Sequence, residues 1–141
     1  MMTRSTADNQ ELVRRFLAGL ARLDVRALQE LITDDFSWTV PGGLSISGTY
    51  QGKSAFEDQF LAGAAELFAP GSLNLEIQHL FAEGDVVVAE YIGTAESATT
   101  GKPYRNDYCV IFRIRNGRIE LGREYMDTAH VAETLISASP A

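Results

Sequence analysis

The last third of the chain holds the residues whose types and spacing best suit chemistry. Two predicted strands, 104–115 and 118–128, are joined at Asn116-Gly117 and carry an unusual share of Tyr, Asn, Glu, Asp and Arg. A small domain places so many polar groups on interior strands mainly when it builds a pocket with a polar end. The alternative is that one face of this hairpin is solvated or contacts a partner.

Alternation along residues 104–115 places Tyr104, Asn106, Tyr108, Val110 and Phe112 on one face, which grades from polar to apolar. Asn106 and Tyr108 are therefore predicted to hold a carbonyl or hydroxyl group of a ligand, unless Asn106 bonds only to nearby protein groups. Along residues 118–128, hydrophobicity favours an inward set, which is Ile119, Leu121, Arg123, Tyr125 and Asp127. Asp127 then becomes a ligand-binding candidate.

Other candidates lie on the remaining strands. His79 shares a face of 73–82 with apolar residues, so it is predicted to be buried, either as a general acid or base or as a structural histidine. Tyr91, on 86–97, offers a phenol to a ligand oxygen or only fills the pocket. Trp38 is predicted to line the cavity wall, with Tyr50 in a similar role, although such residues are often plain core.

Composition excludes several classes of function. The 141 residues fit one domain, and a net charge of −7 from 19 acidic and 12 basic residues argues against a nucleic-acid partner. There is no apolar run of membrane-spanning length and no signal peptide, and the single Cys109 fits a cytoplasmic location. No metal-ligand spacing, phosphate loop or nucleotide fingerprint occurs, so neither a metal nor a cofactor is indicated.

The order of the elements predicts an α+β domain. Helices are expected at 9–23, 24–32 and 53–68, and strands at 36–40, 46–50, 73–82, 86–97, 104–115 and 118–128. Residues 1–8 are predicted to be disordered, 9–130 to form the domain, and 131–141 to be a C-terminal tail. Helices followed by a meander of strands favour helices packed on one face of a curved antiparallel sheet.

Four segments in this order carry a family resemblance, and their ranges are 31–38, 48–53, 80–89 and 116–127. Together they resemble the nuclear transport factor 2-like superfamily, and within it the SnoaL-like polyketide cyclase and ketosteroid isomerase-like branch. The resemblance implies a cone-shaped curved sheet with three helices of the N-terminal half on its concave face. It also implies a ligand cavity at the open end and a homodimer through the sheet.

The resemblance also bears on chemistry. Catalytic carboxylates of related enzymes align best with Glu124, which favours the opposite face of 118–128, with a bulge at Gly122 as a way to reach it. An inward Glu124 would have a raised pKa suited to proton abstraction, and Arg123 and Asp127 would then pair outside. An ordinary surface carboxylate is the alternative. The Arg-x-Asp pair of limonene epoxide hydrolases is replaced by Tyr91 and Gly93, which argues against epoxide hydrolysis.

These observations predict a cofactor-independent isomerase or cyclase that acts on a small hydrophobic, carbonyl-bearing ligand of polyketide or steroid type. Glu124 or His79 would move a proton next to the carbonyl, and Tyr108, Tyr91 or Asn106 would bond the developing enolate oxygen. One alternative is a non-catalytic ligand-binding or dimerisation module. Another is a dehydratase in which His79 shuttles the proton.

Overall fold

The computed structural model of the chain describes residues 5–136. The helices are α1 (Thr6–Ala21), α2 (Val25–Gln29), α3 (Lys53–Ala55), η1 (Phe56–Leu61), α4 (Ala62–Leu67), α5 (Thr128–Val131) and η2 (Ala132–Ile136). The strands are β1 (Ile32–Val40), β2 (Gly48–Gln51), β3 (Asn74–Glu83), β4 (Val86–Glu96), β5 (Pro103–Arg115) and β6 (Arg118–Tyr125).

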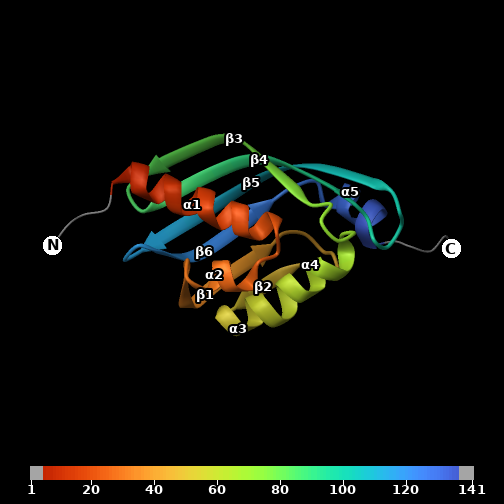
Figure 1. Cartoon of the computed structure of the whole chain (residues 1–141), viewed down its shortest axis with the longest axis horizontal. Helices are drawn as coiled ribbons and strands as arrows, with labels where there is room; N and C mark the ends of the chain where they lie inside the picture. Colours follow the sequence, from red (N-terminus) through yellow and green to blue (C-terminus); the bar gives the residue numbers. More distant parts are fainter. Residues whose placement is uncertain (1–4, 137–141) are drawn as a thin grey trace.

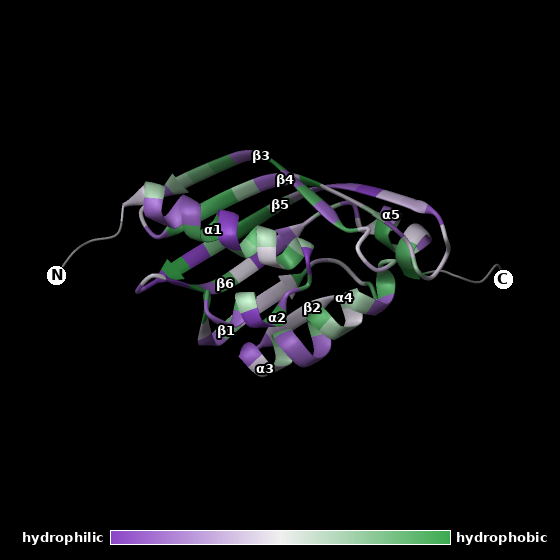
Figure 2. Cartoon of the chain, viewed as in Figure 1, coloured by the Kyte–Doolittle hydropathy of each residue, from purple (hydrophilic) through white to green (hydrophobic). Residues whose placement is uncertain are grey.

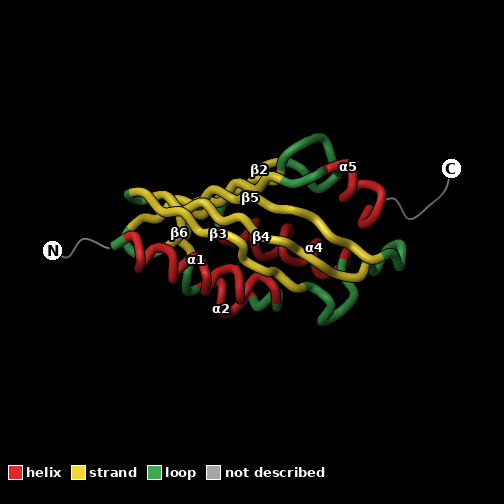
Figure 3. The backbone as a smooth tube through the Cα atoms, turned by 90° about the horizontal axis from the view of Figure 1, so that it is seen from above, coloured by secondary structure: helices red, strands yellow, loops and turns green. Residues whose placement is uncertain are grey.

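The six strands form one curved sheet in the order β2-β1-β6-β5-β4-β3. β1 and β6 run parallel, and the other four neighbouring pairs are antiparallel. α1 packs across β3, β4 and β6, while the helix from α3 to α4 lies below β1 and β2 (Figure 1). Seen from above, α1 and α2 follow one side of the strands, and α5 lies at the far end of the sheet (Figure 3). The predicted α+β fold is confirmed.

The core lies between the helices and the inner face of the sheet. Strand residues alternate between hydrophobic and hydrophilic, as Figure 2 shows. One face of each strand is therefore hydrophobic and can pack against the helices. Phe16 of α1 is fully buried and its ring centroid lies 5.4 to 6.2 Å from those of Phe36, Trp38, Phe56 and Phe112. This aromatic cluster connects the first helix to two strands, β1 and β5, and to η1.

The chain is ordered beyond both ends of the predicted domain. The first helix begins at Thr6 because Ser5 and Asp8 form a reciprocal capping box, so residues 5–8 are not disordered as predicted. At the other end, Asp127 accepts a hydrogen bond from the His130 backbone N–H and caps α5, so residues 131–136 are helical and not a tail. The predictions for residues 1–4 and 137–141 lie outside the described residues.

Two bulges change which side chains face inward. In β3 the register shifts between Ile77 and His79, so that Gln78 is an extra residue and the next inward side chain is Leu80. In β6 the shift falls between Ile119 and Leu121, which makes Glu120 the extra residue. Because alternation reverses across a bulge, the faces predicted from simple period two are wrong beyond each shift.

Candidate functional site

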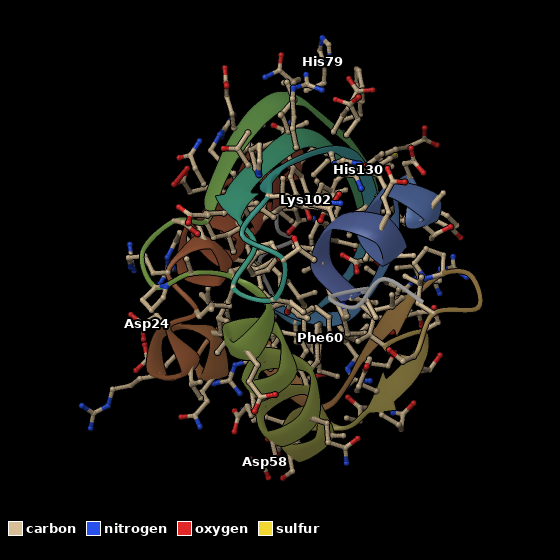
Figure 4. The ribbon with its side chains drawn as sticks, turned by 90° about the vertical axis from the view of Figure 1, so that its right-hand side faces the viewer. Asp24, Asp58, Phe60, His79, Lys102 and His130 are labelled. Carbon is tan, nitrogen blue, oxygen red and sulfur yellow. The ribbon has the colours of Figure 1, made fainter. Side chains whose placement is uncertain are left out.

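A cavity of about 80 Å³ lies between the helices and the inner face of the sheet. Aliphatic and aromatic side chains from α1, η1, α4, α5 and η2, and from the residue after α4, form most of its wall: Leu20, Phe60, Leu67, Phe68, Val131 and Leu135. Figure 4 shows Phe60 between the helix and the sheet, whereas Asp58 of the same helix points outward. The polar groups of the wall come from the sheet and from Gln59 of η1. The helix side of the cavity is therefore mostly apolar, and the strand side is polar.

Glu124 is the ionisable carboxylic acid of this wall. The bulge at Glu120 turns Gly122 and Glu124 inward, and Glu124 is 6% exposed. Burial raises the pKa of its carboxyl from 4.5 to about 8, and the nearby Trp38 indole N–H partly offsets this rise. Burial is the larger effect because no Lys, Arg or His of the described residues lines the cavity. The group is therefore an acid that loses its proton near neutral pH.

Two tyrosines flank the acid on the strand side. Tyr91 of β4 and Tyr108 of β5 pair across the sheet and stack with ring centroids 5.1 Å apart at 9°. Burial raises the pKa of both phenols well above 10, and the charge of Glu124 raises each further. Both hydroxyls therefore stay neutral and keep their protons through the range in which the carboxyl ionises.

The Tyr108 hydroxyl is the inner end of a hydrogen-bond chain. The Tyr104 and Tyr108 oxygens lie 2.5 Å apart, and Asn106 Nδ2 donates to the Tyr104 oxygen at 3.0 Å. Tyr104 is 2% exposed, and no other acceptor for its proton is found in the described residues. If Tyr104 donates to Tyr108, both buried groups are satisfied and the Tyr108 proton is free to point into the cavity.

Gly122 and Trp38 form the wall behind Glu124. The two residues are register partners in the parallel pair of β1 and β6. The indole lies so close over Gly122 that a Cβ there would meet Trp38 Cζ3 at 2.5 Å. Only glycine fits at this point, because any larger residue would displace the ring.

Comparison with known proteins agrees with this architecture. A family model described as a SnoaL-like domain matches residues 13–121. The chain belongs to the SnoaL-like domain family. Protein YesE of Bacillus subtilis (strain 168), which is described as uncharacterized, is 26% identical over 124 residues, or 87% of this chain and 84% of YesE.

Solved structures extend the likeness across almost the whole chain. Bal32a, from a soil-derived mobile gene cassette, is 30% identical with a TM-score of 0.81, and the match covers 92% of this chain and 98% of Bal32a. An NTF2-like protein from Burkholderia xenovorans LB400 is 24% identical with a TM-score of 0.81, over 94% and 99% of the two chains. The predicted SnoaL-like, nuclear transport factor 2-like recognition is confirmed.

Four of the predicted site residues of this SnoaL-like chain meet at one cavity: Tyr50, Tyr91, Tyr108 and Glu124. The predicted bulge at Gly122 occurs instead at Glu120. Because of this bulge, the face of β6 that carries Glu124 points inward. Tyr50 donates from its hydroxyl to the Ile46 carbonyl at 2.7 Å, which fixes the ring at the cavity edge. Trp38 was predicted to line the wall, but it is fully buried behind it.

Two predicted ligand-binding residues bond to the protein instead. Asn106 Nδ2 donates to the Asp127 carbonyl at 3.0 Å, and the Asp127 N–H donates to Asn106 Oδ1 at 3.1 Å. Neither side chain lines the cavity, and Asp127 is exposed and caps α5. The structure agrees with the alternative stated for Asn106, that its side chain bonds to nearby protein groups.

The prediction that His79 is buried is wrong. The Gln78 bulge turns its side chain to the outer face of the sheet, where it is 60% exposed and lies 2.8 Å from Glu90. Figure 4 shows His79 projecting away from the molecule, on the side opposite Phe60. The structure therefore does not bring His79 together with Glu124.

The predictions from sequence did not include the part of the wall that follows β6. Met126, Val131 and Leu135 enter the cavity from the last strand end and from the two C-terminal helical segments. A signal for them existed, because Asp127 is a good helix cap and Val131 and Leu135 are four residues apart. Within residues 5–136 no group of three or more His, Cys, Asp or Glu side chains is placed to hold a metal, and no helix is long and apolar enough to cross a membrane.

Proposed function

We propose that this SnoaL-like protein is a cofactor-independent enzyme that moves a proton at the carbon next to a carbonyl of a small hydrophobic ligand. The observation that carries the proposal is Glu124, a carboxyl with a pKa raised to about 8 by burial in an apolar cavity. A desolvated carboxylate of this kind is a stronger base than one in water. A cavity for binding alone has no need of a buried acid.

The cavity also contains a hydrogen-bond donor for the negative charge that the reaction would create on the carbonyl oxygen. When Glu124 takes the proton, the C–H electron pair moves into the carbonyl and its oxygen becomes an enolate. Tyr108 donates to that oxygen, and Tyr104 behind it strengthens the donor through the 2.5 Å contact. Protonated Glu124 can return the proton to a conjugated carbon, which gives isomerisation. When it first exchanges that proton with solvent and then protonates the original carbon, the result is α-proton exchange.

The size of the cavity narrows the ligand class. About 80 Å³ is well below the roughly 300–1,000 Å³ of pockets that enclose drug-sized ligands. In this conformation the cavity accommodates a small ketone or one ring of a larger ligand. A whole steroid or polyketide ligand requires the helical wall at α4 or η2 to move outward.

The test is exchange of ketone α-protons in D2O, followed by loss of their NMR signal. Cyclohexanone and 2-tetralone serve as one-ring and two-ring probes. The wild-type protein should accelerate exchange, Glu124→Gln should abolish the acceleration, and Tyr108→Phe should reduce it by roughly 10²–10³. Glu90→Gln, on the outer face, is the matched control and should exchange at the wild-type rate.

Binding of 2-naphthol separates the enzyme from the alternative of a binding module. This phenol resembles a planar enolate and should bind the wild-type cavity more tightly than either ketone. Tight naphthol binding with no exchange of either ketone beyond that of Glu124→Gln would contradict the proposed chemistry and favour the binding module. The exposed position of His79 gives no support to a dehydratase in which His79 carries the proton.

We also propose that a second copy of the chain covers the outer face of the sheet. Phe81 is 62% exposed and Tyr125 48% exposed there, and Val88 and Ile111 continue the row from Phe81 across β4 and β5. Sedimentation should show a dimer that Phe81→Asp combined with Tyr125→Asp dissociates, whereas Val25→Asp on α2 leaves it intact. A wild-type monomer at all concentrations would refute this.

A further inference from the structure

The Trp38 indole N–H is a buried donor without a partner. Trp38 is fully buried, and its Nε1 is one of two buried side-chain polar atoms in the described residues that have no hydrogen-bond partner. Such a donor is costly in a protein interior and calls for an explanation. Its neighbour Glu124 is an acid that changes charge, and this change of charge supplies the explanation.

Packing leaves the indole no freedom to turn to another acceptor. Its ring centroid lies 5.7 Å from that of Phe16, 5.9 Å from that of Phe56 and 6.1 Å from that of Phe112. On the remaining side it covers Gly122, at a distance that excludes a Cβ. Glu124 is two residues further along the same strand face, and the indole is near enough to its carboxyl group to lower the pKa of that group.

The other titratable groups that interact with Glu124 are four tyrosines, three of which line the cavity. Tyr50 comes from β2, Tyr91 from β4, and Tyr104 and Tyr108 from β5, and each of these phenols has a raised pKa because of burial. Gln59 of η1 completes the polar wall, and no cationic side chain of residues 5–136 lines the cavity. The indole N–H is therefore the donor that approaches the carboxyl from behind.

We propose that Trp38 is a positioning residue whose indole N–H binds one oxygen of Glu124 when the carboxylate is charged and leaves the other oxygen free to face the substrate. The neutral acid attracts the indole N–H only weakly, so the bond tightens as the proton leaves. A hydrogen bond to the charged form stabilises it, which agrees with the lowering of the Glu124 pKa by Trp38. The catalytic consequence rests on the proposed function, but the hydrogen bond does not.

The single tryptophan of the chain makes the test direct, because the NMR spectrum of the ¹⁵N-labelled protein contains one indole N–H signal. That signal should move downfield between pH 6 and pH 10, with a midpoint near the Glu124 pKa of about 8. In Glu124→Gln it should not move in this range. An indole signal that stays constant in the wild-type protein while Glu124 ionises would overturn the proposal.

Trp38→Phe supplies the second measurement, because it keeps an aromatic ring and removes the donor. The midpoint of Glu124, read from the ¹³C signal of its carboxyl, should rise by about one to two pH units. An unchanged midpoint in a folded variant would overturn the proposal. If Trp38→Phe does not fold, the comparison of wild type with Glu124→Gln still decides.

Both titrations are made without substrate, so they separate this proposal from the proposed function. Titration of the indole with no ketone exchange would refute the enzyme and leave the positioning role in place. Exchange that depends on Glu124 without any titration of the indole would refute the role of Trp38 alone.

Discussion

Replacing Glu124 by glutamine should make the protein more stable at high pH and leave it almost unchanged at low pH. Glutamine keeps the size of the side chain and cannot become charged. In the folded wild-type chain the carboxyl has a pKa of about 8 because of burial, against an ordinary value of 4.5. Between these two values the folded state holds a proton that the unfolded chain has released, so the free energy of unfolding falls as the pH rises.

The size of the effect follows from the two pKa values. Each pH unit within the window lowers the free energy of unfolding by about 1.4 kcal/mol. The whole window, from 4.5 to about 8, therefore corresponds to about 5 kcal/mol, which is fully expressed above pH 8. Since small domains are stable by only about 5–15 kcal/mol, this one side chain takes up a large share of the margin.

Urea denaturation at pH 5 and pH 9, followed by circular dichroism, measures the difference between variant and wild type. Glu124→Gln should gain several kcal/mol over the wild type between the two pH values. Glu76→Gln, which removes an exposed carboxylate from β3, is the control and should show no comparable gain. A Glu124→Gln advantage of the same size at both pH values would refute the raised pKa and with it the reasoning on the base.

Three further expectations concern the wall and the reaction. Gly122→Ala should lower the free energy of unfolding by about 1–3 kcal/mol or more, because its Cβ would lie 2.5 Å from Trp38. Gly63→Ala, whose Cβ has no neighbouring atom within 4 Å, should instead raise the free energy of unfolding by about 0.5–1 kcal/mol. Urea denaturation measures both. Tyr104→Phe should slow ketone exchange about fivefold, since it removes a hydrogen bond of about 1 kcal/mol to Tyr108, and an unchanged rate would contradict the relay. Exchange in the wild type should rise with pH and level off above pH 8, because only the charged carboxylate accepts a proton; a rate that falls over this range would point to the neutral acid instead.

The sequence predicted the order of elements well, because helical periodicity and turn residues act locally. Which side chains face inward was harder to predict, since one extra residue reverses a whole strand. His79 was assigned to the interior by correct alternation from Leu75 and Ile77, and the Gln78 bulge defeats that alternation. Glu124 was reached by family resemblance, while simple hydrophobicity pointed to Tyr125, which is 48% exposed.

Asn106 also has a role that differs from the predicted one. Its type and position on the inner face of β5 are those of a ligand-binding amide, yet its amide group is engaged by Tyr104 and by the Asp127 backbone. Those partners are 2 and 21 residues away, and the distant one is brought close only by the turn into α5. No local pattern contains that information, because it depends on how the chain leaves the last strand.

A single irregularity in β6 accounts for the main features of the site. The extra residue Glu120 turns both Gly122 and Glu124 toward the helices. Gly122 thereby opens the space that the Trp38 indole fills, and Glu124 loses water on the same face two residues later. The bulge thus places an ionisable group where the fold is least able to solvate it and sets a rigid N–H donor beside it. That burial should reduce stability above pH 5, and the same burial makes the carboxylate basic enough to take a proton from carbon.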